Sequence, residues 1–225
     1  MANYKKQCLS EMLGTYLLVF FGPGSVVAAS LLSLTAIESL LFVAAVFGGT
    51  VAVVILGLGR FSGAHINPAI SVGSAVAGLL KRELFVPYVV FQLIGGILAG
   101  LTLKMVFGAV SGTTLGSTEL ASGISPVEGV ALETAGTFIL ALSALTAGSL
   151  VKSRLKQAVL VGGTLFVLIL FIGPLTGASF NPARSLGPSL FSDFFSGQII
   201  YYAGPVLGAA CAGLVFGLLR RSHGK

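Results

Sequence analysis

The sequence predicts an all-α membrane protein with six transmembrane helices and two half-helices in an inverted internal repeat. Three observations lead to this fold class. The chain is very apolar, with 55% hydrophobic residues, 9% charged residues and a mean hydropathy of +1.01. It contains six apolar blocks close to the about 20 residues that cross a bilayer core. The tripeptide Asn-Pro-Ala occurs twice, 114 residues apart, once in each half of the 225-residue chain.

The six apolar blocks are the expected membrane spans. The first follows Lys5 and Lys6, an arrangement also found in secretory signals. The apolar run from Leu9 to Leu34 is too long for a signal peptide and has no obvious small-residue cleavage site. It is therefore interpreted as a span. The six spans cover roughly residues 9–33, 37–59, 84–107, 127–150, 156–173 and 197–219.

Two short apolar segments remain, 67–77 and 181–191, and each begins at an Asn-Pro-Ala tripeptide. Asn is a favourable N-cap and Pro fits the first position of a helix. About 11 residues at 1.5 Å each make a helix of roughly 16 Å, which is half a membrane. The sequence therefore predicts two half-helices that together make one crossing. Their starting residues are Asn67, Pro68, Ala69, Asn181, Pro182 and Ala183.

An internal repeat extends beyond these tripeptides. The segment 11–18 matches 133–140 at an offset of 122, and 88–100 matches 201–213 at an offset of 113. Repeat one is expected at about 5–110 and repeat two at about 127–220. Each contains three spans, an odd number, so the second copy enters the membrane from the opposite face. Inverted repeats of this kind place broken helices near the midplane.

The basic residues predict the orientation of the chain in a plasma (cell) membrane. Eleven of the thirteen fall on one side if the N-terminus is cytoplasmic, and the opposite loops 34–38, 108–126 and 192–196 contain none. Both termini are therefore expected in the cytoplasm. The eleven are Lys5, Lys6, Arg60, Lys81, Arg82, Lys152, Arg154, Lys156, Arg220, Arg221 and Lys225. No nucleic-acid partner is expected, because these residues occupy short loops without a soluble domain.

These motifs resemble those of the aquaporin (major intrinsic protein) family over nearly the whole chain. The resemblance rests on both Asn-Pro-Ala boxes, the Glu-x-x-Gly-Thr-aromatic starts at Glu11 and Glu133, and the Arg184-Ser185 extension of the second box. It implies six tilted helices plus two half-helices, with 1–225 as one transmembrane channel domain. It also implies a homotetramer in the lipid bilayer, with one pore per subunit that conducts water. No cofactor is expected.

The segments before the half-helices must be non-helical at membrane depth, so their carbonyls are expected to line a water-filled cavity. The expected pore-lining residues are Gly63, Ala64, His65, Gly177 and Ser179. Asn67 and Asn181 should cap their helices through the side-chain oxygen and leave the amide N–H groups free as donors. Both half-helices point their positive N-termini at this place, which should repel cations, including a migrating proton.

Three charged residues have expected roles beside the pore. Unsatisfied backbone N–H groups of the two loops need acceptors. The resemblance assigns Glu11 to the first loop and Glu133 to the second. Arg184 follows Asn181 by three residues, and a charge so deep in a membrane is usually functional.

The resemblance places a selectivity filter at Phe47, Ile169, Ala178 and Arg184. Water-specific members usually carry a His where this chain has Ile169. The glycerol-conducting branch usually has a small residue there, an aromatic at the position of Ala178 and an Asp at that of Ser185. The filter therefore resembles the water branch but lacks the His donor. Water is expected as the main permeant, with weak passage of glycerol or another small neutral solute.

Two other classes of function fit the sequence less well. An ion-coupled secondary transporter of a small neutral solute also uses inverted repeats and broken helices, but it normally needs a charged midplane site. The only deep charge here besides the two glutamates is Arg184. An enzyme is not expected, because the chain has no Ser/His/Asp set and only two His. Cys8 and Cys211 have no metal-ligand spacing and are expected as small core residues. Gln92 in the third span receives no role.

Overall fold

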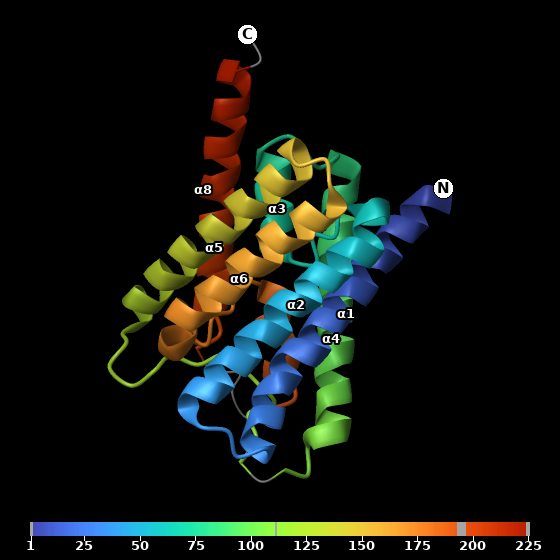
Figure 1. Cartoon of the computed structure of the whole chain (residues 1–225). Helices are drawn as coiled ribbons and strands as arrows, with labels where there is room; N and C mark the ends of the chain where they lie inside the picture. The colour runs from blue at the N-terminus through green and yellow to red at the C-terminus, as the bar shows by residue number, and fades with distance from the viewer. Residues whose placement is uncertain (1, 111, 193–196, 224–225) are drawn as a thin grey trace.

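The structure is a computed structural model that describes residues 2–110, 112–192 and 197–223. In this part of the chain it contains eight α-helices and no strand, and the long helices are tilted against one another (Figure 1). The fold class predicted from the sequence is confirmed: six long helices and two half-helices. The helices are α1 (Ala2–Leu31), α2 (Ala36–Ser62), α3 (Pro68–Val76), α4 (Arg82–Phe107), α5 (Pro126–Leu150), α6 (Arg154–Thr176), α7 (Pro182–Ser189) and α8 (Ile200–His223).

The six long helices have the length and composition to cross a membrane. Their outward faces carry large apolar side chains, among them Val53, Phe171 and Leu218, which are 66%, 74% and 66% exposed. Such side chains are stable in contact with lipid. In water, a contiguous apolar surface of this kind would favour association with other proteins. The chain is a multi-pass membrane protein.

Local sequence explains where two of the long helices begin. At the start of α2, the Thr35 hydroxyl accepts from the N–H of Glu38, and the Glu38 carboxylate accepts from the N–H of Thr35 at 2.8 Å. Ser125 and Glu128 make the same reciprocal pair at the start of α5. Each pair is a capping box that satisfies backbone donors which the helix leaves without partners.

Some helix ends differ from the predicted spans. The half-helices are shorter than expected, with nine residues in α3 and eight in α7. After α3 the chain turns through Gly78, whose φ is +70°. Helix α1 begins earlier than the apolar block, because polar residues such as Lys5 and Lys6 continue the helix beyond the apolar segment. Residues 193–196 of the expected basic-free loop, and Lys225, lie outside the described residues.

The two half-helices pack on long helices from the other half of the chain. Helix α3 contacts α8, and α7 contacts α4. The backbones come so close that a Cβ on Gly96 would lie 2.5 Å from the carbonyl oxygen of Ala183. On the other side, a Cβ on Gly73 would lie 2.7 Å from the carbonyl oxygen of Ala209. Small residues permit this close helix approach within a membrane.

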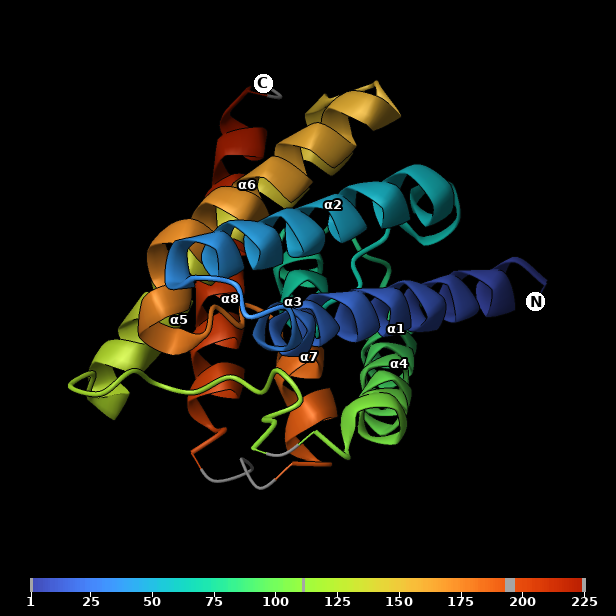
Figure 2. The same cartoon turned by 60° about the horizontal axis from the view of Figure 1, so that its bottom comes forward.

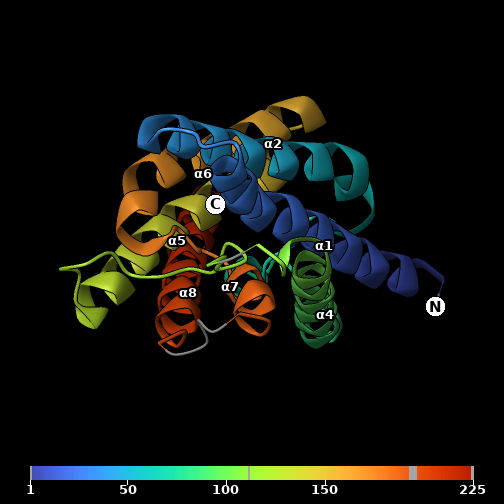
Figure 3. The same ribbon diagram turned by 90° about the horizontal axis from the view of Figure 1, so that it is seen from below.

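The bundle surrounds the place where the half-helices meet. Helix α1 packs on α2 and α4, α5 packs on α6 and α8, and α2 packs on α6. Helices α3 and α7 lie end to end at the centre (Figure 2). Both described ends of the chain lie at the upper end of the bundle in Figure 1. The connection between α4 and α5 runs across the opposite end (Figure 3).

Candidate functional site

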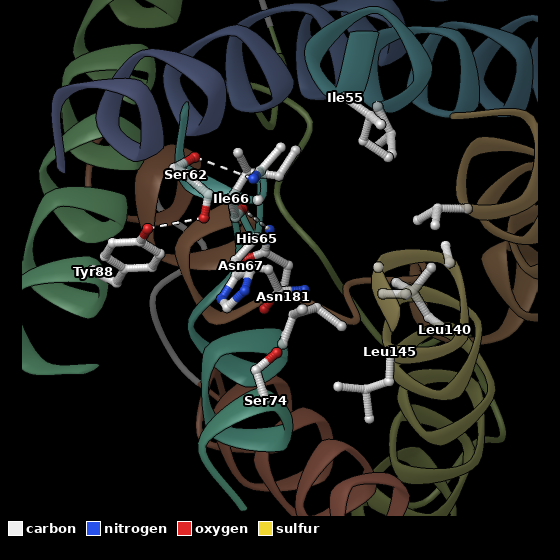
Figure 4. Close-up of a pocket in the computed structure, with 18 of the residues that line it drawn as sticks. Ile55, Ser62, His65, Ile66, Asn67, Ser74, Tyr88, Leu140, Leu145 and Asn181 are labelled. Carbon is white, nitrogen blue, oxygen red and sulfur yellow. Dashed lines mark hydrogen bonds between the residues drawn. The ribbon is translucent and has the colours of Figure 1, made fainter. Parts of the chain in front are cut away.

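A cavity of about 420 Å³ lies between the two halves of the chain. It extends from Lys81 and Gln157, at one end of the bundle, to Phe47 and Arg184 in the interior. One wall is apolar, and the other is polar and formed by the segments that precede the half-helices. Figure 4 shows the two walls on opposite sides of the space. Ile55, Leu140 and Leu145 are among the labelled residues on the apolar side, and His65, Asn67 and Asn181 are among those on the polar side. A polar molecule in this cavity can therefore form hydrogen bonds with the polar wall only.

The two segments before the half-helices share an unusual backbone. In the first, Gly63, Ala64 and Ile66 have φ values of +90°, +52° and +46°. In the second, the residues 114 positions later, Gly177, Ala178 and Phe180, have φ values of +77°, +46° and +53°. Non-glycine residues in this left-handed region cost of order 1–3 kcal/mol each. The surrounding contacts must therefore hold both segments in place.

Two buried carboxylates hold these segments. Glu11 is 0% exposed and accepts from the N–H groups of His65 at 3.0 Å and Ile66 at 2.6 Å. Glu133 is also 0% exposed and accepts from the N–H groups of Ser179 at 3.0 Å and Phe180 at 2.8 Å. Bonds from backbone N–H groups to a carboxylate are among the stronger hydrogen bonds in proteins. Each carboxylate thus satisfies two donors that no helix ladder serves.

Gln92 supports the first of these carboxylates, a role that sequence reasoning missed. Its side-chain nitrogen donates to Glu11 at 2.7 Å and to the Ser71 hydroxyl at 2.9 Å. Ser71 in turn lies 3.1 Å from Nδ1 of His65, which lines the cavity. Gln92 is 0% exposed, and its only signal in the sequence is an amide within an apolar span.

Hydroxyl groups support the second segment instead. Thr176 donates to Glu133 at 2.7 Å, and the Ser179 hydroxyl lies 2.5 Å from that of Ser185. The Ser185 hydroxyl also lies 2.9 Å from that of Thr118, which belongs to the connection between α4 and α5. These supporting residues were not predicted, apart from the use of Ser185 as a branch marker. Thr118 and Glu133 lie 67 and 43 residues from the partners Ser185 and Thr176, so no local pattern joins them to the second segment.

The connection between α4 and α5 lies directly on the second segment. A Cβ on Gly177 would lie 3.2 Å from Cα of Thr118 and 3.3 Å from the nitrogen of Glu119. Partial burial here raises the pKa of the Glu119 carboxyl above its ordinary value. Sequence reasoning treated this connection only as a loop without basic residues, yet it packs directly against the second non-helical segment.

The two box asparagines cap their own half-helices and also join the two halves of the chain. The side-chain oxygen of Asn67 accepts from Ala69 N–H at 2.8 Å, and that of Asn181 accepts from Ala183 N–H at 3.0 Å. The Asn67 amide donates to the carbonyl of Phe180 at 2.7 Å. The Asn181 amide donates to the carbonyl of Ile66 at 2.9 Å.

The expectation that these amide N–H groups stay free is therefore wrong for one N–H of each side chain. An Asn amide carries two N–H groups. The cross-links use one from each asparagine, so one remains for a molecule in the cavity that both residues line. The carbonyls of Ile66 and Phe180 are occupied by the same cross-links and offer less to a permeant.

Positive charge is concentrated at the inner end of the cavity. The N-termini of α3 and α7 meet there, and each carries about +0.5 of a charge. Arg184 is 3% exposed and lines the same space. Its Nη1 donates to the carbonyl of Gly116 at 2.7 Å, and its guanidinium carbon lies 5.0 Å from the centre of the Phe47 ring. This arrangement repels cations and favours neutral molecules.

The structure brings together many of the residues predicted for the site, but not all at one surface. Phe47, Arg184 and both box asparagines line the cavity, and so do four of the five predicted loop residues, Gly63, Ala64, His65 and Ser179. Ile169 and Ala178 are buried in the same apolar cluster as Phe47. They and Gly177 are not part of the described cavity wall.

The two cysteines lie away from this cavity wall. Cys8 is buried near the start of α1, whereas Cys211 is exposed on α8. The expectation of a core position is therefore wrong for Cys211, because its helix face is turned outward. Across the described ranges, no group of three or more His, Cys, Asp or Glu side chains is placed to hold a metal ion.

A helical bundle in which two half-helices meet beside a two-sided polar and apolar cavity is the architecture of a membrane channel. Residues 1–216 match the family model of the major intrinsic proteins, and the chain belongs to that family. Aquaporin NIP1-2 of Oryza sativa subsp. japonica is 37% identical over 217 residues, covering 94% of this chain and 71% of the relative.

Other relatives match over a similar length. Aquaporin AqpM of Methanothermobacter thermautotrophicus is 31% identical over 242 residues, covering 96% of this chain and 98% of the relative. The solved structure of the aquaglyceroporin from Plasmodium falciparum superposes with a TM-score of 0.83 and 25% identity. It covers 96% of this chain and 95% of that protein.

Proposed function

We propose that this chain is a passive membrane channel whose main permeant is water and which excludes protons and ions. The observation that carries the proposal is the meeting of α3 and α7 at a cavity lined by Asn67, Asn181 and Arg184. Each asparagine presents one free N–H, which is a hydrogen-bond donor, to the permeant. The oxygen of a water molecule at the joint must therefore accept from both asparagines. Water turned in this way cannot pass a proton along the file, because its own hydrogens point away from the joint.

The non-helical segments supply the complementary acceptors. The carbonyls of Gly63, Ala64, His65, Gly177 and Ser179 are proposed to offer acceptors to water on the two sides of the joint, and all of these residues except Gly177 line the described cavity. The apolar wall opposite, which includes Val51 and Leu165, offers no competing bonds. A water molecule that enters therefore loses some hydrogen bonds to other waters and replaces them with bonds to one wall only. This arrangement suits water molecules that pass in single file.

The filter is proposed to consist of Phe47, Ile169, Ala178 and Arg184. Phe47 and Arg184 supply an apolar face and a donor at the end of the cavity. Ile169 adds a second apolar face where a His would have supplied another donor. Weak passage of glycerol or another small neutral solute follows, since a carbon backbone can contact these apolar groups. The likeness to a protein described as an aquaglyceroporin supports this breadth.

The proposed assembly and orientation rest on the surface of the bundle and on its charges. A homotetramer with one pore per subunit agrees with the apolar outward faces of the six long helices. The distribution of basic residues supports cytoplasmic termini in a plasma membrane. The corresponding contacts of α1 with α4 and of α5 with α8 support an inverted repeat of about 5–110 and 127–220 within one channel domain, 1–225.

An ion-coupled transporter is not favoured. The buried charged side chains among the described residues are Glu11, Glu133 and Arg184. Both carboxylates accept several hydrogen bonds from the protein, and Arg184 is bonded to Gly116. Groups committed in this way have little capacity to bind and release a coupling ion.

Stopped-flow light scattering of proteoliposomes tests the proposal. An osmotic gradient should drive rapid shrinkage in vesicles that contain the protein, and a Na⁺ or H⁺ gradient should leave the rate unchanged. Solute uptake that depends on an ion gradient would support the transporter instead. Shrinkage no faster than that of empty vesicles would contradict the channel itself.

A further inference from the structure

Two groups hold the Arg184 guanidinium at the end of the cavity. The Gly116 carbonyl accepts from its Nη1 at 2.7 Å, and the Phe47 ring lies 5.0 Å from its central carbon. Its Nε has no hydrogen-bond partner within the described part of the chain. The position of this cation, and therefore the width beside it, depends on where the Gly116 carbonyl and the Phe47 ring lie.

Both groups rest on two consecutive residues of α1. A Cβ on Gly22 would lie 2.5 Å from Cζ and 2.7 Å from Cδ1 of Phe47. A Cβ on Gly116 would lie 2.7 Å from Cα and 2.8 Å from the carbonyl carbon of Pro23. Distances below 3.0 Å are essentially never seen for real Cβ atoms. The ring and the loop backbone are therefore each in direct contact with α1.

The loop that carries Gly116 has little freedom to move away from Pro23. Gly116 has a φ of +72°, and the preceding Leu115, with φ +53°, is 1% exposed. The N–H groups of these two residues donate to the hydroxyls of Thr113 and Thr114. Pro23 has a ring-restricted φ, so its backbone is a stiff support. The carbonyl that holds Arg184 is thus fixed against α1.

We infer that the Gly22-Pro23 step of α1, which is not part of the described cavity wall, determines the selectivity of the channel. Gly22 sets the depth of the Phe47 ring and Pro23 sets the position of the Gly116 carbonyl. Together they place the Arg184 guanidinium and set the width of the constriction. The inference rests on the proposed function, because it assigns these residues to the filter of a channel.

The first test replaces Gly22 with Ala in the full-length chain reconstituted into proteoliposomes. The added methyl should push the Phe47 ring toward Arg184 and narrow the passage. The ratio of formamide or glycerol permeability to water permeability should fall about tenfold, which corresponds to about 1.4 kcal/mol of barrier, within the cost of one overpacked methyl group. If the wild type passes neither solute, the water permeability itself should fall.

Gly49→Ala is the matched control, because Gly49 is also a glycine in a long helix but a Cβ there would meet nothing within 4 Å. It should leave the solute-to-water ratio unchanged. Equal ratios in Gly22→Ala and Gly49→Ala would overturn the inference. The wild-type osmotic water flux is measured in the same preparation, so a chain that conducts no water would contradict the proposed function and not this inference alone.

The double variant Gly22→Ala/Phe47→Leu separates the contact from general damage. Since the clash is with the Phe47 ring, the effect of Gly22→Ala on the ratio should disappear in a Phe47→Leu background. An effect of the same size in both backgrounds would overturn the inference. If Gly22→Ala does not fold, the double variant should recover folded protein, and its failure to do so would count against the contact.

The second half of the inference is tested with Gly116→Ala. The methyl would meet the Pro23 backbone and displace the carbonyl from Arg184, so proton leak should rise and the solute-to-water ratio should change. Gly112→Ala is its control, because Gly112 has a φ of +70° and nothing within 4 Å of a Cβ. It carries the same backbone strain without the contact. Equal leak in the two variants would overturn the role of Pro23.

Discussion

Arg184 illustrates how a single side chain gains its role from its neighbours. A cation within a membrane span is costly, and here it is 3% exposed. The Gly116 carbonyl and the face of the Phe47 ring offset part of that cost. Its side chain lines the cavity, and its Nε has no hydrogen-bond partner within the described part of the chain. We therefore propose that the charge both excludes cations and orients water.

Replacing Arg184 with Val should therefore retain water flux and admit more protons. The loss of one donor changes the barrier for water by about 0.5–1.5 kcal/mol, so water permeability should stay within about tenfold of the wild type. The loss of the fixed charge should raise proton leak, measured with a pH-sensitive dye inside proteoliposomes. Unchanged leak together with collapsed water flux would indicate a structural role for Arg184 instead.

Ile169 is the residue at which the proposed filter departs from the pattern that the family resemblance implies for water-specific members. Ile169→His should add a donor for water and remove an apolar surface for a carbon backbone. Glycerol permeability should fall more than water permeability, by up to about tenfold, since one hydrogen bond is worth about 0.5–1.5 kcal/mol net. Light-scattering assays of both permeants give the ratio. An equal fall of both would show that Ile169 does not set selectivity.

At the scale of elements, the two non-helical segments have the same backbone but different supports. Ser62 and Thr176 occupy matching positions, and each accepts from the N–H two residues later at 3.1 Å. Thr176 also donates to Glu133, whereas on the first side Gln92 donates to Glu11. The residue that matches Gln92 at the offset of 113 is Pro205, which has no side-chain donor. The same geometry is therefore held by different chemistry.

This difference predicts a specific loss of stability in Gln92→Leu. The change removes one of the three donors to the buried Glu11 carboxylate and one partner of the Ser71 hydroxyl, and each hydrogen bond lost contributes about 0.5–1.5 kcal/mol, or more where the acceptor is charged. The thermal unfolding temperature of the detergent-solubilised protein should fall clearly below that of the wild type. Ile94→Leu, on an exposed part of the same helix at 39% exposure, is the control and should change little. Similar unfolding temperatures for both variants would contradict the support role.

At the scale of the whole molecule, the bundle reverses the pattern of a protein in water. Its outward faces are apolar, while its most buried side chains include Glu11, Glu133 and Gln92. Lipid allows the first, and mutual hydrogen bonding allows the second. A side chain on an outward face, such as the thiol of Cys211, is therefore separated from the cavity between the two halves of the chain.

The placement of the two cysteines within this bundle predicts resistance to mercurials. Cys8 is buried near one end of α1, Cys211 is exposed on the outer side of α8, and neither belongs to the described cavity wall. Water permeability of the wild type should survive mercurial treatment, whereas Ala178→Cys should become sensitive. Strong inhibition of the unmodified protein would mean that one of these cysteines, or the filter, is wrongly placed.

The sequence by itself determined the six spans, the two half-helices and the capping asparagines. These features follow from local rules: apolar length sets a span, and Asn-Pro sets the first turn of a helix. The motifs of the family resemblance also single out Glu11, Glu133 and Arg184. Each of these features can be recognised within a single segment of the sequence.

Only the tertiary structure decided which groups complete the site. The cross-links from Asn67 to Phe180 and from Asn181 to Ile66 join residues more than a hundred positions apart. Gly116 holds Arg184 from a loop with no motif, and Gly22 supports Phe47 from another helix. The packing of the helices brings each donor to its acceptor. The spacing of two residues along the chain does not by itself give their distance in space.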